Sequence, residues 1–191
     1  MHLYLKSRIF ALNKVLPTFY TFIFMANYSI TIENRNLINL YCNNNLLGTL
    51  NLSTFNLTKA YIQLGSNIIN FKYLGWFKSD MQLLLNNIPI FLVKSNWTGN
   101  VRKIYELNNT LTPIYIIKAS GFFKKEFQLL NTANHIIIAL QLNFSFRKFN
   151  IAFDINQIDA LKLNNENNYL ILVVAYFGML TRKRNVAASQ A

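Results

Sequence analysis

Residues Tyr169–Leu180 read YLILVVAYFGML, an uncharged and almost wholly apolar stretch near the C-terminus. As a helix, these twelve residues extend about 18 Å, whereas the hydrocarbon core of a bilayer is about 30 Å thick. A helix that is apolar around its whole circumference is typical of burial inside a protein. Ala175 and Gly178 form a narrow side that a strand can approach closely. The stretch therefore predicts a central helix, over residues 166–183, that the rest of the domain covers.

Polar residues on both sides of the apolar stretch suit the ends of a helix. Asn164 or Asn165 can cap its N-terminus, where the Glu166 carboxylate also suits the positive end of the helix dipole. Arg182–Arg184 places positive charge near the negative C-terminal end. Residues 185–191 have no pattern and predict a disordered tail.

Between residues 27 and 163, short apolar runs alternate with turn signals at intervals of about eight to twelve residues, which is typical of an all-β domain. Asn43–Asn45 and Asn86–Asn87 lie at expected chain reversals, since Asn tolerates left-handed backbone. We therefore predict one mainly β domain over residues 27–184, a closed antiparallel barrel of about twelve strands around the buried hydrophobic C-terminal helix. The expected strands are 28–32, 37–42, 46–52, 60–64, 68–74, 81–85, 88–95, 101–107, 114–119, 122–130, 135–142 and 144–153.

The last expected strand contains a change of phase. Phe144 and Phe146 share one face, whereas Phe149, Ile151 and Phe153 share the other. A β-bulge at the intervening basic pair, Arg147 and Lys148, would account for the change.

The chain also contains an internal repeat. Residues 75–84 (GWFKSDMQLL) match residues 121–130 (GFFKKEFQLL), and each copy leads through a turn into a further apolar strand. The match predicts a hairpin-like unit that occurs twice within one barrel. Asp80 and Glu126 occupy equivalent positions, and each is expected to pair with a nearby lysine at the surface.

Residues 1–26 have three interpretations. Basic residues precede an uncharged run from Val15 to Ile32, an arrangement that resembles a signal peptide or membrane anchor. Phe24 is too large for a small-x-small cleavage site, and Pro17 interrupts the apolar run. The segment is otherwise an annotation overhang ahead of Met25 or a disordered leader, and the third interpretation is an integral part of the fold.

Basic residues outnumber acidic ones, 19 to seven, which gives a net charge of +12. Such a charge either confers solubility or attracts anionic lipid or nucleic acid. Nucleic acid is not expected as a partner, because the basic residues lack a cluster interleaved with exposed aromatic residues. The candidate contacts with an anionic surface are Lys78, Arg102, Lys103, Lys124, Lys125, Arg147 and Lys148.

No catalytic constellation is present, so we expect no enzyme activity, no cofactor and no metal. Cys42 is the single cysteine, and His135 stands at the start of an expected strand, where a turn role is the default. Trp97 lies in a loop, and the sequence favours its packing over an end of the barrel. The alternative is a Trp that contacts a membrane or a partner.

Many short strands followed by an apolar C-terminal helix, together with the two Gly-aromatic-Phe-Lys repeats and Lys94–Trp97, resemble small bacterial members of the tubby C-terminal-like superfamily. That superfamily includes the tubby domain, the phospholipid scramblases and the plant LURP-one-related proteins. The resemblance covers about residues 27–184 and implies a closed barrel threaded by its C-terminal helix. It carries over no functional residue. The chain lacks the clustered acidic residues of the scramblase calcium site, which argues against that activity.

The first functional hypothesis is a non-catalytic binding module that associates peripherally with anionic phospholipid through a basic outer surface, in a cytoplasmic protein. The second is an intracellular structural or protein-interaction domain whose charge only confers solubility. The third is a membrane-associated protein anchored through residues 15–32.

Overall fold

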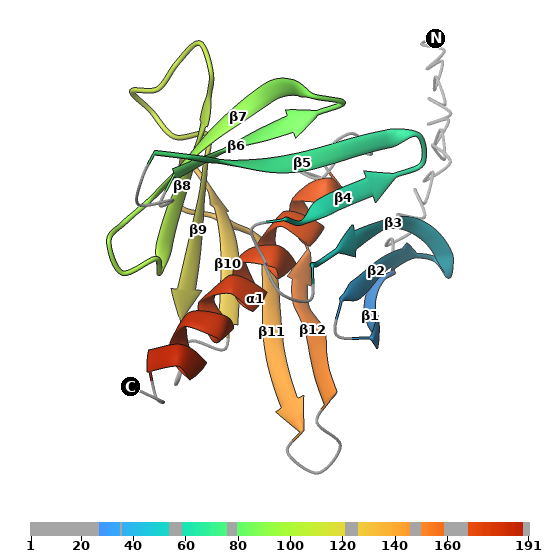
Figure 1. Cartoon of the computed structure of the whole chain (residues 1–191). Helices are drawn as coiled ribbons and strands as arrows, with labels where there is room; N and C mark the ends of the chain where they lie inside the picture. The colour runs from blue at the N-terminus through green and yellow to red at the C-terminus, as the bar shows by residue number, and fades with distance from the viewer. Residues whose placement is uncertain are drawn as a thin grey trace, which may run out of the picture.

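The computed structural model describes residues 27–34, 36–53, 59–75, 80–120, 126–145, 150–158 and 168–188. Within these residues the chain forms one twelve-stranded antiparallel sheet and one helix, α1 (Tyr169–Ala188). Each strand pairs with the strand that follows it in the sequence, and β1 and β12 also contact each other, which makes the sheet a nearly closed barrel (Figure 1). The strands are β1 (Tyr28–Asn34), β2 (Leu37–Cys42), β3 (Asn45–Asn51), β4 (Tyr61–Leu64), β5 (Asn67–Leu74), β6 (Asp80–Leu85), β7 (Ile88–Ser95), β8 (Val101–Glu106), β9 (Tyr115–Ser120), β10 (Glu126–Asn131), β11 (Ile136–Ser145) and β12 (Asn150–Ile158).

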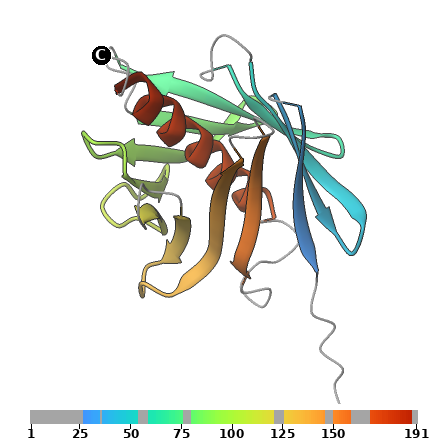
Figure 2. The same cartoon turned by 90° about the horizontal axis from the view of Figure 1, so that it is seen from below.

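Helix α1 lies within the curve of the sheet and contacts β2, β3, β4, β10 and β11 (Figures 1 and 2). Its residues from Leu170 to Phe177 are each at most 1% exposed, around the full circumference of the helix. Burial on every side explains why the stretch has no polar face. The predicted fold, a mainly β barrel around a buried hydrophobic C-terminal helix, is confirmed.

The helix extends further than the sequence predicted. It ends at Ala188, so residues 185–188 are helical and were wrongly assigned to a disordered tail. No Gly or Pro follows Thr181, and Arg and Ala favour the helix, so nothing stops it after Arg184. The last turn consequently contains no basic residue, and the predicted match between Arg182–Arg184 and the helix C-terminus is wrong. Residues 1–26, 159–167 and 189–191, including the expected capping residues, lie outside the described residues.

Two tyrosine hydrogen bonds tie strands to the helix. The Tyr28 hydroxyl on β1 donates to Asn168 Oδ1 at 3.0 Å, immediately before the helix begins. The hydroxyls of Tyr73 on β5 and Tyr176 on α1 lie 2.7 Å apart, and the Tyr176 ring stacks on Phe71 with 4.0 Å between the ring centroids. These bonds satisfy polar groups that burial would otherwise leave without water.

Asparagine forms the tightest turns, as its clustering predicted. Asn43 and Asn44 join β2 to β3 with φ angles of 50° and 65°, and Asn86 and Asn87 join β6 to β7 with φ angles of 49° and 69°. Two consecutive positive φ angles characterise the type I′ turn, whose twist matches that of the strands it joins. Asn is one of the few residues that adopt this conformation at low cost.

The segment predicted as a twelfth strand over residues 144–153 is instead parts of two strands. Phe144 belongs to β11 and pairs with Ile151 of β12, and Ser145 pairs with Asn150. The change of phase therefore reflects a reversal of the chain, and the bulge predicted at Arg147 and Lys148 is wrong. The two residues fall in the connection between β11 and β12, outside the described residues.

The repeated segments contribute equivalent strands, β6 and β10. Met81 and Leu83 of β6 and their counterparts Phe127 and Leu129 of β10 are all buried. Alternate side chains of each strand thus face the helix in the same register. The lysines of the repeat lie outside the described residues, so the predicted surface ion pairs with Asp80 and Glu126 remain predictions.

Candidate functional site

Three lysines share the outer face of the sheet on the neighbouring strands β7, β8 and β9. Lys94 of β7 lies directly opposite Lys103 of β8, and both side chains are exposed. Lys118 of β9 pairs with Val101, which makes it the diagonal neighbour of Lys103 on the same face. We call these three residues the lysine row. They alternate along their strands with buried residues that face the helix, so the pleat of the sheet fixes their outward direction.

The lysine row places three positive charges on one face, and the carboxylates of Asp80 and Glu126 lie on the flanking strands β6 and β10. Within the described part of the chain, none of the three ammonium groups forms an ion pair. The Lys94 Nζ lies 5.1 Å from the centroid of the Tyr105 ring, which is a cation–π contact. Like charges directly opposite on paired strands repel each other, so an anion held between Lys94 and Lys103 would relieve an unfavourable interaction.

The turn that joins β7 to β8 presents Trp97 to solvent. Its side chain is 95% exposed, which corrects the prediction that Trp97 packs over an end of the barrel. Hydrogen bonds of Asn96 shape the turn: its backbone N–H donates to the Val101 carbonyl at 3.0 Å, and its side-chain Oδ1 accepts from the Val101 N–H at 3.1 Å. Gly99 completes the turn with a φ angle of 71°. These hydrogen bonds therefore hold the backbone of the turn in place, whereas the Trp97 side chain is exposed to solvent.

Arg102 was predicted as a surface contact and is instead an interior residue. Its side chain is 1% exposed, and its guanidinium carbon Cζ lies 4.4 Å from the centroid of the Phe177 ring of α1. Arg102 and Ile104 share the inner face of β8, whereas Lys103 between them faces outward. The guanidinium contributes to the packing of the helix and is not accessible to an anionic surface.

Of the other predicted contacts, Lys103 is exposed, whereas Lys78, Lys124, Lys125, Arg147 and Lys148 lie outside the described residues. The sequence-based list missed Lys94 and Lys118. Hairpin register could have identified Lys94, because Lys94 and Lys103 flank the same turn at positions that face each other.

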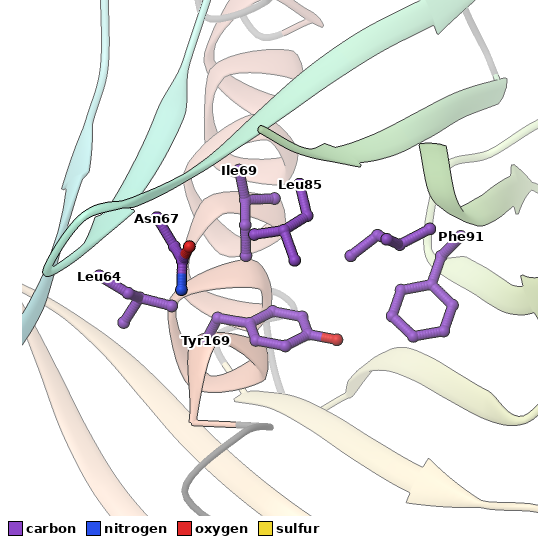
Figure 3. A pocket seen from close by; sticks show the side chains of 7 residues that line it. Leu64, Asn67, Ile69, Leu85, Phe91 and Tyr169 are labelled. Carbon is purple, nitrogen blue, oxygen red and sulfur yellow. The ribbon is translucent and has the colours of Figure 1, made fainter. Parts of the chain in front are cut away.

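A second feature lies at the opposite end of β7. An apolar pocket of about 370 Å³ opens between the β4–β5 hairpin, the β6–β7 hairpin and the first residue of α1 (Figure 3). We call it the end pocket. It is lined by Leu64, Asn67, Ile69, Leu85, Ile90, Phe91 and Tyr169.

Tyr169 supplies a buried polar group to the end pocket. Only 8% of the residue is exposed, and Figure 3 shows its ring across the pocket with the hydroxyl directed toward Phe91. No hydrogen bond joins this hydroxyl to any of the residues that the structure describes. Burial, and to a lesser extent the neighbouring Tyr115, raises the pKa of the Tyr169 phenol above its usual range, so the group stays protonated and acts as a donor.

A metal ion needs several ligating side chains that come together at one point. In the described ranges, no three His, Cys, Asp or Glu side chains come together in a way that could hold a metal ion. His135 is exposed beside the β10–β11 turn, and its backbone N–H donates to Asn131 Oδ1 at 2.9 Å. This contact agrees with the turn role expected for the residue.

Comparison with protein-family models, with curated proteins and with solved structures found no match to this chain. No helix in the part of the chain that the structure describes is both long enough and apolar enough to span a membrane.

Proposed function

We propose that this chain is a non-catalytic binding module that associates peripherally with anionic phospholipid through its basic outer surface. The β7–β8 hairpin and the neighbouring strand β9 make the contact, with the lysine row on their outer face and Trp97 at the tip of the hairpin. In this role the protein acts at the cytoplasmic leaflet, where anionic lipids are concentrated. Membership of the tubby C-terminal-like superfamily is part of the same proposal, and the arrangement of twelve strands around a C-terminal helix supports it.

The observation that carries the proposal is the combination, on one hairpin, of the exposed Trp97 with Lys94 and Lys103, which form no ion pair with any described residue. Trp has an apolar ring and a polar N–H, which suits it to the boundary between lipid headgroups and acyl chains. Lysine side chains are long enough to reach phosphate and carboxylate groups while their stems stay on the protein surface. A membrane surface satisfies both at once, whereas water leaves a large apolar ring exposed beside repelling charges.

Replacing Lys94 and Lys103 together with Gln is expected to weaken binding to vesicles of phosphatidylcholine and phosphatidylserine about 30-fold. Each lysine near an anionic surface contributes about 1 kcal/mol, and about 1.4 kcal/mol corresponds to a factor of ten. Sedimentation of the full chain with vesicles measures the partition coefficient. Binding should also fall with added salt, because salt screens exposed charges.

The matched control for this charge change is the double replacement of Lys59 and Lys72 with Gln. Both lysines are exposed, and neither belongs to the lysine row. The control removes the same net charge and should retain most of the binding. Equal binding to pure phosphatidylcholine vesicles, or equal losses in the two double variants, would contradict the proposal and favour a protein-interaction domain.

Replacing Trp97 with Ala is expected to weaken vesicle binding about tenfold, because partial burial of a large aromatic ring in the interface contributes about 1.5 kcal/mol. Trp97 fluorescence should shift to shorter wavelength when the intact protein binds vesicles. Leu111→Ala is the control, since Leu111 is 91% exposed but lies in the connection between β8 and β9. Unchanged binding by Trp97→Ala would remove the hairpin tip from the interface.

A further inference from the structure

We propose that the end pocket binds a small, neutral, apolar molecule that carries an acceptor oxygen, and that the Tyr169 hydroxyl donates a hydrogen bond to that oxygen. The pocket volume of about 370 Å³ lies at the lower end of the range of small-molecule sites, about 300–1,000 Å³. This site is separate from the lysine row, because it lies at the other end of β7.

The lining determines the apolar character of the ligand. Ile69 is buried beneath the pocket, and Leu64, Leu85, Ile90 and Phe91 present half-buried apolar side chains from β4, β6 and β7. A ligand that covers these side chains removes apolar surface from water, which supplies most of the affinity of such sites.

Two hydrogen-bond donors of the lining, on Tyr169 and Asn67, determine where the ligand must place its acceptor oxygen. The Tyr169 hydroxyl is the buried one, and as a neutral phenol it can donate a hydrogen bond. Asn67 lies at the rim, where its side-chain Oδ1 accepts a hydrogen bond from Asn86 Nδ2 at 3.0 Å. Because that bond occupies the oxygen, the Asn67 Nδ2 is turned toward the Tyr169 side of the pocket (Figure 3). Both groups offer N–H or O–H, so a carbonyl or ether oxygen suits them.

The charge around the pocket favours a neutral ligand over an anionic one. Glu106 lies directly opposite Phe91 in the β7–β8 ladder and is exposed. The lining residues include no Lys, Arg or His. A carboxylate in the pocket would therefore lose its hydration and meet a like charge at the rim.

The test uses prodan, an uncharged naphthalene dye with one ketone oxygen, whose emission moves to shorter wavelength when it leaves water. Titration of the full chain should show saturable binding. Tyr169→Phe should weaken it about fivefold, equivalent to about 1 kcal/mol for one neutral hydrogen bond. Ile90→Trp should abolish saturable binding by filling the pocket. Octan-2-one should displace the dye, whereas octanoate at the same concentration should not.

Matched controls are Tyr61→Phe and Ile88→Trp, at exposed positions outside the lining, which should bind the dye like the unchanged protein. Thermal melting verifies that each variant is folded, and Leu85→Phe replaces Ile90→Trp if the latter is not. Native-like binding by the folded filling variant would overturn the site. An unchanged affinity in Tyr169→Phe would overturn the role of the hydroxyl, and equal displacement by octanoate would overturn the neutral class.

Discussion

Replacing Val174 with Asp is expected to abolish cooperative folding of the barrel. Val174 is 0% exposed in the middle of α1, and its neighbours on every side are apolar. A carboxylate there would lose its hydration without gaining a partner, or would take up a proton at a comparable cost. We expect a loss of about 5 kcal/mol or more, which approaches the whole stability of many domains. Far-UV circular dichroism and urea unfolding measure the effect.

Two control variants separate the charge from other effects of the substitution. Val174→Ala leaves a cavity but no charge and should cost about 2 kcal/mol with the fold intact. Ile88→Asp places the same charge at a position that is 68% exposed and should change the free energy of unfolding by less than about 0.5 kcal/mol. A Val174→Asp protein that folds cooperatively and is merely released from membranes would show that the helix is a membrane anchor and not the axis of a barrel.

The central helix could be predicted from sequence because its signal is redundant. Length, the absence of charge and the apolar circumference of Tyr169–Leu180 all lead to the same conclusion. The end of the helix was harder to predict, since no residue between Thr181 and Ala188 strongly breaks a helix. The strand positions could also be predicted, because Asn-rich turns interrupt the apolar runs. The turns at Asn43–Asn44 and Asn86–Asn87 need the left-handed backbone that Asn tolerates.

It was harder to predict which side chains of each strand point toward the helix, and the candidate site depends on this orientation. In Val101–Tyr105, each face of the strand carries one cation and at least one apolar residue, so alternation alone does not decide whether Arg102 or Lys103 faces the helix. Inside the barrel, the Arg102 guanidinium lies against the ring of Phe177. Phe177 is distant in the sequence, so this contact could not be predicted from the residues around Arg102. Reversal of the chain between Phe144 and Ile151 was likewise missed because a hairpin and a bulge produce the same change of phase.

The end pocket and the exposure of Trp97 could not be predicted, because both depend on how closely separate hairpins approach the helix. Tyr169 reads in the sequence as the first residue of an apolar stretch. Its hydroxyl acquires a role only where the β4–β5 and β6–β7 hairpins stand on either side of it. The distances between the hairpins and the helix depend on the curvature of the barrel. The local pattern of apolar residues in the sequence does not specify that curvature.

Replacing Gly178 with Val is expected to destabilise the protein by about 3 kcal/mol and to lower its melting temperature by about 10 °C. A Cβ atom at this position would lie 3.1 Å from Phe153 Cε1 and 3.2 Å from Phe127 Cδ2. The prediction that Gly178 marks a side where strands approach is therefore confirmed, since the two rings belong to β12 and β10. Valine adds two further carbons toward these rings. Differential scanning calorimetry measures the shift.

Gly178→Ala separates helix propensity from crowding. Alanine should favour the helix by about 1 kcal/mol over glycine, yet its Cβ requires both rings to move by a few tenths of an ångström. We expect these terms nearly to cancel, so that Gly178→Ala melts close to the unchanged protein.

A double-mutant cycle tests whether the crowding comes from Phe127. Phe127→Leu alone opens space beside the helix and should cost about 1–2 kcal/mol. Combined with Gly178→Val, it should cost less than the sum of the two single changes by at least about 1 kcal/mol, because the valine methyl groups occupy the space that the ring leaves. Strict additivity would mean that α1 does not press on β10 at this point. In that case the glycine would serve the helix for a reason other than the close approach of a strand.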